Sequence, residues 1–391
     1  MSAPGDVGHS RIRARPRIDS VDLLRGVVMV VMTLDHTRDF AARSGFDPRD
    51  VTQPALFVTR WITHFCAPVF VFLAGTSAYL YGQRGKRPAE VTRFLFTRGL
   101  WLVFLELTLV RWGWTFDIVP RFVGLQVIWA IGWSMVALSV LHRLPFGMLA
   151  IVSLTMIAGH NLLDGITSPT VGWWWNFVHA SGPLPAVAGV RVFVAYALIP
   201  WIGVMSAGYC FGTIILEPPE KRRRALLAIG FAAIAAFMLL RWTNVYGDPA
   251  SWSWQATPLR TVLSFVNCEK YPPSLLFLLM TLGPAILFLA LVDGFQPGPI
   301  SRQIVTIGRV PLFYYLLHLP LIHGTVLLLA VATYGADFLT SAAPMTKPPG
   351  FGYSLPIVYA LWVLTVLVLL PACRWFAAVK QRRTEWWLSY L

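Results

Sequence analysis

The chain has 391 residues, of which 56% are hydrophobic and only 13% are charged, and its mean hydropathy is +0.62. Because soluble domains contain about 25% charged residues, this composition excludes an ordinary soluble protein. The net charge of +14 does not indicate nucleic-acid binding, since the basic residues form short runs between apolar stretches, as in the cytoplasmic loops of membrane proteins.

Ten apolar stretches are long enough to cross a lipid bilayer. They predict an all-α, polytopic integral membrane protein with about ten transmembrane helices. We expect these helices near residues 21–40, 56–82, 92–111, 119–141, 145–163, 190–216, 224–241, 273–294, 303–332 and 354–379.

Basic residues predict which loops face the cytoplasm, because Lys and Arg are enriched there. An arginine-rich tail at residues 1–17 precedes the first span. Later basic residues lie at 84–93, 143, 221–224, 302 and 380–383. With ten crossings all of them fall on one side, so we expect both termini to be cytoplasmic. The tail lacks the apolar core of a signal peptide, and we expect residues 18–391 to form a single transmembrane domain.

Two longer segments, at residues 164–189 and 242–272, then lie outside, and both contain tryptophan clusters. Two interpretations of these clusters remain open. Tryptophan gathers at membrane interfaces, or the rings could form the walls of an external substrate cleft. The residues are Trp173, Trp174, Trp175, Trp252 and Trp254.

The first predicted span carries charged side chains, which are unfavourable in a bilayer and therefore indicate a function. Asp22 and Arg25 lie near its start, and Asp35, His36 and Asp39 lie near its end. Helical spacing places most of them on roughly one face, with Arg25 and His36 about 16 Å apart. This spacing predicts a polar stripe that links the two sides of the membrane.

Histidines in two other spans could approach this stripe. The second span runs back from the outside, so His64 lies in the outer half of the membrane and could face His36 in a two-histidine site. In the ninth span, His318 lies near mid-membrane, and His323 follows Pro320. Since proline removes a backbone donor, we expect a kink there that leaves carbonyl groups free to face a cavity.

Further polar residues are predicted to be buried, and an aqueous or ligand-filled pocket would satisfy them together. The candidates for this pocket are Asp39, Glu106, Gln126, Asn161, His318 and His323.

These residue types fit acyl transfer, in which a base takes the proton from an attacking hydroxyl or amine. His36 and His64 are candidates for that base, and Asp35 could orient it. Arg25, with Asp22 beside it, is suited to bind the phosphate groups of a donor, because a guanidinium forms bidentate bonds with phosphate. An ion pair between Asp22 and Arg25 with no further role remains the alternative.

Several motifs together resemble one family. They are Arg17, Ser20, Asp22, Arg25-Gly26 and Asp35-His36, followed by residues 61–64, 68–75, 105–108, 126–132 and 308–318. This pattern resembles the bacterial relatives of heparan-alpha-glucosaminide N-acetyltransferase, within the wider transmembrane acyltransferase superfamily. The resemblance covers nearly the whole chain.

The resemblance implies transfer of an acyl group, usually acetyl from cytoplasmic acetyl-CoA, to a sugar acceptor across the membrane, by a core of about ten helices. In related O-acyltransferases, an arginine and a histidine eleven residues later resemble Arg25 and His36. The heparan-modifying enzymes differ, because they have asparagine at the position of His36 and a catalytic histidine farther upstream than His64. They also have an amino-terminal luminal domain for which this chain shows no counterpart, so heparan specificity is not expected.

We therefore expect direct transfer from acyl-CoA to a glycan or amino sugar, with a covalent acyl intermediate on His36 as an open alternative. The resemblance also implies a bacterial inner membrane and makes a homodimer an option. A proton-coupled transporter is the competing class, since buried Asp, Glu and His residues also serve proton relays. We expect no metal cofactor, because no metal-binding spacing is visible around the possible ligands. Those ligands would be Asp35, His36, His64 and His318.

Overall fold

The computed structural model describes residues 19–45, 47–336, 347, 350–383 and 385–390, so the predicted basic tail at 1–17 lies outside the described residues. Within them, six helical segments are long and apolar enough to cross a membrane. They are Pro54–Gly82, Phe146–Leu163, Leu198–Ile215, Pro219–Thr243, Pro311–Tyr334 and Leu355–Arg382. Four of these segments bury less than a third of their apolar window inside the protein, which fits contact with lipid and an integral membrane protein.

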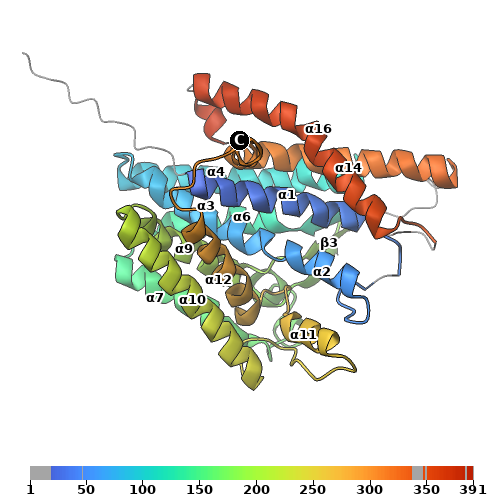
Figure 1. Ribbon diagram of the computed structural model, residues 1–391, viewed down its shortest axis with the longest axis horizontal. Coiled ribbons are helices and arrows are strands. Elements are labelled where there is room, and N and C mark those ends of the chain that lie inside the picture. The colour runs from blue at the N-terminus through green and yellow to red at the C-terminus, as the bar shows by residue number, and fades with distance from the viewer. Residues whose placement is uncertain (1–18, 46, 337–346, 348–349, 384, 391) are drawn as a thin grey trace, which may run out of the picture.

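The described chain is mostly helical (Figure 1). The first helices are α1 (Asp19–Ala41), α2 (Pro54–Thr63), α3 (Cys66–Gly82), α4 (Pro88–Leu105), α5 (Arg111–Thr115), α6 (Val127–Leu141), α7 (Phe146–Gly159) and α8 (Ser168–Val171). The later helices are α9 (Leu198–Ile215), α10 (Pro219–Thr243), α11 (Pro258–Val266), α12 (Leu275–Leu291), α13 (Pro299–Arg309), α14 (Pro311–Tyr334) and α16 (Leu355–Arg382). Shorter turns of π or 3-10 helix are η1 (Glu106–Val110), η2 (His160–Leu163), η3 (Asn176–Ala180) and η4 (Trp386–Ser389).

Each predicted span coincides with at least one helix, although several spans are divided. The second span is α2 and α3, the third continues from α4 through η1 into α5, and the ninth is α13 and α14, which meet at Val310. Six long segments, and not ten, meet the criterion for crossing among the described residues, while α6 and α12 are apolar but shorter. The helix α14 continues through Pro320 to Tyr334.

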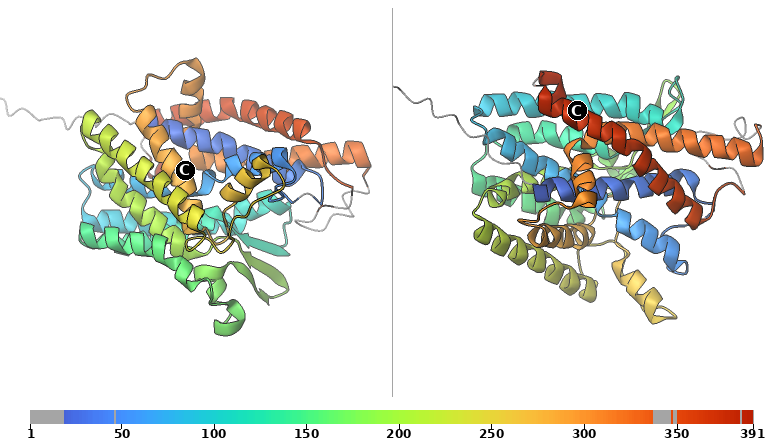
Figure 2. Two further views of the ribbon diagram at one scale, coloured as in Figure 1. Left: turned by 60° about the horizontal axis from the view of Figure 1, so that its bottom comes forward. Right: turned by 45° about the horizontal axis from the view of Figure 1, so that its top comes forward.

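A small three-stranded sheet corrects the all-α prediction. It contains β1 (Phe122–Leu125), β2 (Gly182–Val187) and β3 (Val190–Val194), in the order β1-β3-β2. Strand β3 pairs in parallel with β1 and antiparallel with β2. Figures 1 and 2 show it at the end of the bundle where α2 and α11 also lie. The strands were missed because β1 and β3 are mostly apolar and end one to three residues before α6 and α9, so each merges with a helix into one apolar stretch.

The polar first helix is held inside the bundle, where α1 packs against α2, α3, α12, α13, α14 and α16. Two glycine residues allow α1 to cross α13 very closely. A Cβ atom on Gly26 would lie 2.0 Å from the carbonyl oxygen of Ile304, and one on Gly308 would lie 1.9 Å from that of Asp22. Because no side chain fits there, the backbones of α1 and α13 lie directly against each other. This contact fixes the start of the polar stripe.

Candidate active site

The stripe on α1 is buried at both ends. Four residues of the stripe, Asp22, Asp35, His36 and Arg38, are buried, and the side chain of Arg25 is 15% exposed. Buried charges in a membrane protein need partners or a ligand. The partners differ along the helix.

His36 is paired with His318 of α14. The Nδ1 atom of His36 lies 2.6 Å from the Nε2 atom of His318, and the two rings are stacked with centroids 4.9 Å apart. Two residues 282 positions apart in sequence thus form the two-histidine site. This pair replaces the pairing of His36 with His64 that the sequence left possible.

The hydrogen bonds fix which ring nitrogens carry protons. The Nδ1 atom of His318 lies 2.6 Å from the carbonyl oxygen of Tyr315, which can only accept, so this nitrogen carries a proton. In a neutral His318, Nε2 is then an acceptor, and the Nδ1–H of His36 donates to it. The Nε2 atom of His36 is therefore left with a free lone pair, which is the state of a general base.

His64 occupies a different environment. Its ring is fully buried and lies 5.2 Å from the ring of Phe277, measured between centroids. Neither ring nitrogen has a hydrogen-bond partner in the described part of the chain. His64 therefore has neither a fixed tautomer nor the histidine partner expected for it.

Asp35 takes part in an ion-pair network and is not bonded to His36. It accepts a hydrogen bond from Thr63 at 2.7 Å, and the guanidinium of Arg38 lies 2.7 Å and the ammonium of Lys270 3.8 Å from its oxygens. Arg38 also reaches Asp39 at 2.7 Å. Burial alone would lower the pKa of Lys270, but Tyr271 and Asp35 raise it above its ordinary value, so the ammonium stays charged beside Asp35.

A cavity of about 440 Å³ opens beside the other end of the stripe. Its lining contains one carboxylate, Asp22, and several basic side chains. The basic side chains are Arg25, Arg84, Arg98, Arg309 and Lys380. This excess of positive charge suits an anionic ligand.

Arg25 belongs both to this cavity and to the expected ion pair. Its guanidinium lies 2.9 Å from Asp22, and it also donates to the hydroxyl of Ser77 at 2.9 Å and to the carbonyl of Gly308 at 3.2 Å. Arg84 and Arg98 form no ion pair with any described carboxylate. The cavity thus contains cations that the described fold does not neutralise.

The inner part of the cavity lies close to the histidine pair, although neither histidine is among the residues that line it. Met32, one turn before His36, and Tyr315, whose ring lies 6.1 Å from that of His36, both line the cavity. The Tyr315 hydroxyl is buried and has no hydrogen-bond partner among the described residues. A ligand that extends from the basic residues to Met32 and Tyr315 would therefore lie near His36.

Three residues expected in the pocket have structural contacts elsewhere. Glu106 accepts the backbone N–H of Trp129 at 3.0 Å and so caps the start of α6, where Gln126 is the N-cap residue. His323 donates to the carbonyl of Gly113 at 3.0 Å and stacks between Phe40 and Phe116. These three residues do not line the cavity described above, and neither does Asp39. His318 is the predicted pocket residue that contacts His36.

The sequence analysis did not identify Tyr315 and Arg98. Tyr315 precedes His318 by three residues and so shares its helix face, which was a usable signal. Arg98 is an arginine inside a predicted span, and the cost of such a residue should have indicated function.

The comparisons with known proteins identify a family. A model of one protein family, described as heparan-alpha-glucosaminide N-acetyltransferase, catalytic, matches residues 17–248, which is more than half of the chain. A search of curated proteins finds no match. The matched range contains Arg25, His36 and Arg98, and His318 lies beyond it. The chain therefore belongs to the heparan-alpha-glucosaminide N-acetyltransferase catalytic family and is a membrane enzyme of the acetyltransferase type.

Proposed function

We propose that this protein transfers an acetyl group from acetyl-CoA, bound from the cytoplasmic side, to the amine or hydroxyl of a sugar at the external side. Family membership supports acetyl-CoA as the donor and a sugar as the acceptor. The observation that carries the proposal is the cavity whose lining extends from basic side chains, two of which form no ion pair with a described carboxylate, to Met32 and Tyr315 beside the His36–His318 pair. We further propose that residues 18–391 act as one catalytic domain in a bacterial inner membrane.

The residues around the cavity fit the donor. Its volume of about 440 Å³ lies within the range of roughly 300–1,000 Å³ that is usual for small-molecule sites. Phosphate groups are best held by guanidinium side chains, and Arg25, Arg84 and Arg98 supply these at one end. Beyond them the lining is mainly apolar, which suits an uncharged arm. When bound, acetyl-CoA supplies the acetyl group as a thioester.

The sidedness follows from the same residues. Arg84 and Lys380 line the cavity and belong to basic runs that the sequence predicts to be cytoplasmic. His36 lies about three turns farther along α1, toward the other side of the membrane. The donor would therefore enter where it is made, and the acceptor would approach His36 from outside.

His36 would act as the general base. Its free Nε2 takes the proton of the attacking hydroxyl or amine as the new C–O or C–N bond forms, and this proton then passes to the leaving sulfur as the C–S bond breaks. His318 acts as a positioning residue, because its Nε2 accepts the Nδ1–H of His36 and holds the ring in the required tautomer.

Tyr315 would complete the site as a hydrogen-bond donor. Its hydroxyl is buried, has no described partner and lines the cavity near His36. A donor without a protein partner is available to the carbonyl oxygen of the thioester, on which negative charge develops during attack.

The test is thiol release by the protein in lipid nanodiscs, measured with a thiol-reactive dye. We expect acetyl-CoA to yield free CoA when amino sugars or a polysaccharide extract are added. Mass spectrometry should then show an acceptor in which one hydrogen is replaced by an acetyl group. Absence of thiol release with every acceptor, together with proton-driven solute uptake by vesicles, would instead establish the competing transporter. No feature of the described residues favours that transporter.

Proteoliposomes with the protein in one orientation test the sidedness. If acetyl-CoA is added only to the side of the basic cavity, acetylated acceptor should accumulate on the opposite side. Accumulation of the product on the same side as the donor would contradict transfer across the membrane.

A further inference from the structure

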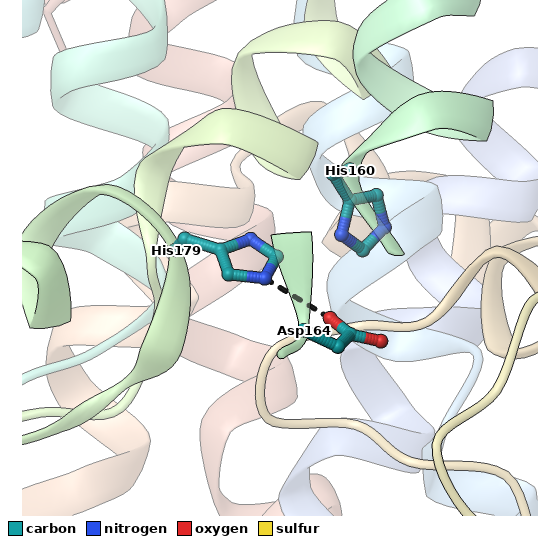
Figure 3. A group of neighbouring side chains, drawn as sticks. All are labelled: His160, Asp164 and His179. Carbon is teal, nitrogen blue, oxygen red and sulfur yellow. Dashed lines mark hydrogen bonds and ion pairs between the residues drawn. The ribbon is translucent and has the colours of Figure 1, made fainter. Parts of the chain in front are cut away.

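We propose that His160, Asp164 and His179 form a binding site for a divalent first-row transition-metal ion, with Zn²⁺ as the best match. Figure 3 shows the three side chains converging on a common space. One ligand atom from each residue lies within 4.8 Å of the other two. This cluster is separate from the His36 site and does not depend on the proposed transfer reaction.

The three residues come from two segments that the fold brings together. His160 begins η2, directly after α7, and Asp164 follows the last residue of that turn. His179 lies in η3, which leads into β2. A shared ion would therefore tie the start of the segment at 164–189 to its later part.

The spacing is close to that of a tetrahedral site. Ligand atoms around Zn²⁺ with bonds of about 2.0–2.1 Å lie roughly 3.3 Å apart. The Nε2 atom of His179 is already 3.0 Å from Asp164 Oδ1, and the ring centroids of the two histidines are 5.6 Å apart. The remaining distances, up to 4.8 Å, would close by small rotations of the side chains.

His160 is the residue that points most directly to a ligand. The residue is only 2% exposed, yet neither ring nitrogen makes a hydrogen bond of normal distance and angle to a described residue, and the backbone of Pro273 offers at most a weaker contact. Leaving a buried polar group without a good partner is unfavourable. A bond from His160 to a metal ion would remove this deficit, because neutral imidazole is a good ligand for Zn²⁺.

Neighbouring contacts hold the ligands in place. Asn161 donates to the second oxygen of Asp164 at 2.9 Å, and its own oxygen accepts the backbone N–H of Leu275 at the start of α12. The ring of Trp175 packs on His179 with centroids 5.2 Å apart. Contacts of this kind around the ligands orient them and are typical of metal sites that the protein fold preorganises. In the metal-bound state His179 would carry its proton on Nδ1.

The ligand set determines the class of ion. Two imidazoles and one carboxylate favour Zn²⁺ and its neighbours over Ca²⁺ and Mg²⁺, which prefer oxygen ligands only. The side chain of Asp164 is 26% exposed, so water can reach the fourth position. By linking His160 to Asp164 and His179, the ion would stabilise the segment at 164–189.

The experiment uses the full chain purified without a polyhistidine tag. We expect about one Zn²⁺ per chain by mass spectrometry, and after chelation a titration with Co²⁺ should give the visible absorption band of a tetrahedral site. His160→Asn should weaken the affinity by more than about 100-fold, because loss of an outer contact alone typically costs 10–100-fold. His142→Asn is the matched control, since His142 bonds to Thr92 at 2.8 Å and does not belong to the cluster.

The same preparation gives a second measurement that does not require a folded variant. Zn²⁺ added to the stripped wild-type chain should raise its Tm, whereas Mg²⁺ should not. Absence of the Co²⁺ band and of the Tm rise in the wild type would overturn the proposal. Equal uptake by the His160→Asn and His142→Asn chains would show adventitious binding and would overturn it as well.

Discussion

The two ends of α1 carry similar charged groups but use them in different ways. At the C-terminal end, charged side chains of both signs pair with one another. The ion-paired residues are Asp35, Arg38, Asp39 and Lys270, and the cations Arg60 and Lys347 lie close to them. At the N-terminal end, basic side chains outnumber the single carboxylate that lines the cavity.

This difference separates charge that serves the fold from charge that is available to a ligand. Ion-paired side chains are held together by their own contacts, whereas an excess of one sign in a cavity attracts an ion of the opposite sign. His36 lies at the C-terminal end, next to Asp35 in the chain, but its ring is hydrogen-bonded to His318. Substitutions at the ion-paired residues, at the residues of the basic cavity and at His36 should therefore affect different properties, namely stability, donor binding and the chemical step.

The largest expected effect is on the chemical step. His36→Asn should lower kcat by about 1,000-fold, because a general base contributes roughly 10²–10⁴-fold to the rate. Thermal unfolding should change little by comparison. Steady-state thiol release at saturating acetyl-CoA measures the loss.

His64→Phe is the matched control for this prediction. Phenylalanine fills the buried site beside Phe277 and removes two nitrogens that have no described partner. We expect kcat to stay within about threefold of the wild type, in line with a buried residue outside the chemistry. The reverse result, with activity lost in His64→Phe and retained in His36→Asn, would move the base to His64.

The next effect concerns the ion pairs at the C-terminal end of α1. Asp35→Asn leaves the buried Arg38 and Lys270 with too little negative charge, and breaking such a network costs about 3 kcal/mol. Asp39→Asn should cost less than about 1 kcal/mol, because the Asp39 side chain is 41% exposed and its ion pair with Arg38 is therefore screened by solvent. Thermal unfolding in detergent would show the difference, and equal Tm values for the two variants would contradict the structural role assigned to this end.

The sequence predicted the helices better than it predicted the contacts between them. Apolar stretches locate the long helices, because membrane spans must be long and apolar, whereas the short α8 and α11 lie in segments that were predicted as external loops. The strands β1 and β3 were lost inside such stretches, since four or five mostly apolar residues shortly before a helix show no clear period of their own. The predicted polar stripe is present on α1, because it depends only on the spacing within one helix.

The partners of the stripe could not be predicted in the same way. His36 and His318 are 282 residues apart, and only the packing of α14 against α1 brings them together. The His160 cluster was also missed, although the spacing of four between His160 and Asp164 places both on one side of a helical turn. That spacing was a usable signal, whereas the contribution of His179 depends on η3.

A smaller effect on kcat is expected for Tyr315. The accompanying change in Tm distinguishes a catalytic role of the hydroxyl from a structural one. Tyr315→Phe should lower kcat by about 30-fold if the hydroxyl donates to the reacting carbonyl, somewhat less than the loss of a preorganised donor in an oxyanion hole. Since this hydroxyl has no described protein partner, its removal should leave the Tm unchanged or raise it slightly. A lower Tm with unchanged kcat would assign the hydroxyl to the fold.

The smallest effect tests the excess charge at the N-terminal end of α1. Arg98→Met should raise the KM for acetyl-CoA by about tenfold with little change in kcat, because one charge-assisted contact to phosphate is worth about 1.4 kcal/mol. Arg93→Met is the control on the same helix, since Arg93 is exposed and does not line the cavity. High salt screens exposed charges such as that of Arg93 and also weakens the contact of Arg98 with phosphate. The difference between the two variants should therefore shrink as the salt concentration rises. If both arginines changed KM equally, the cavity would be acting only through its general field, and the donor would not be held by Arg98.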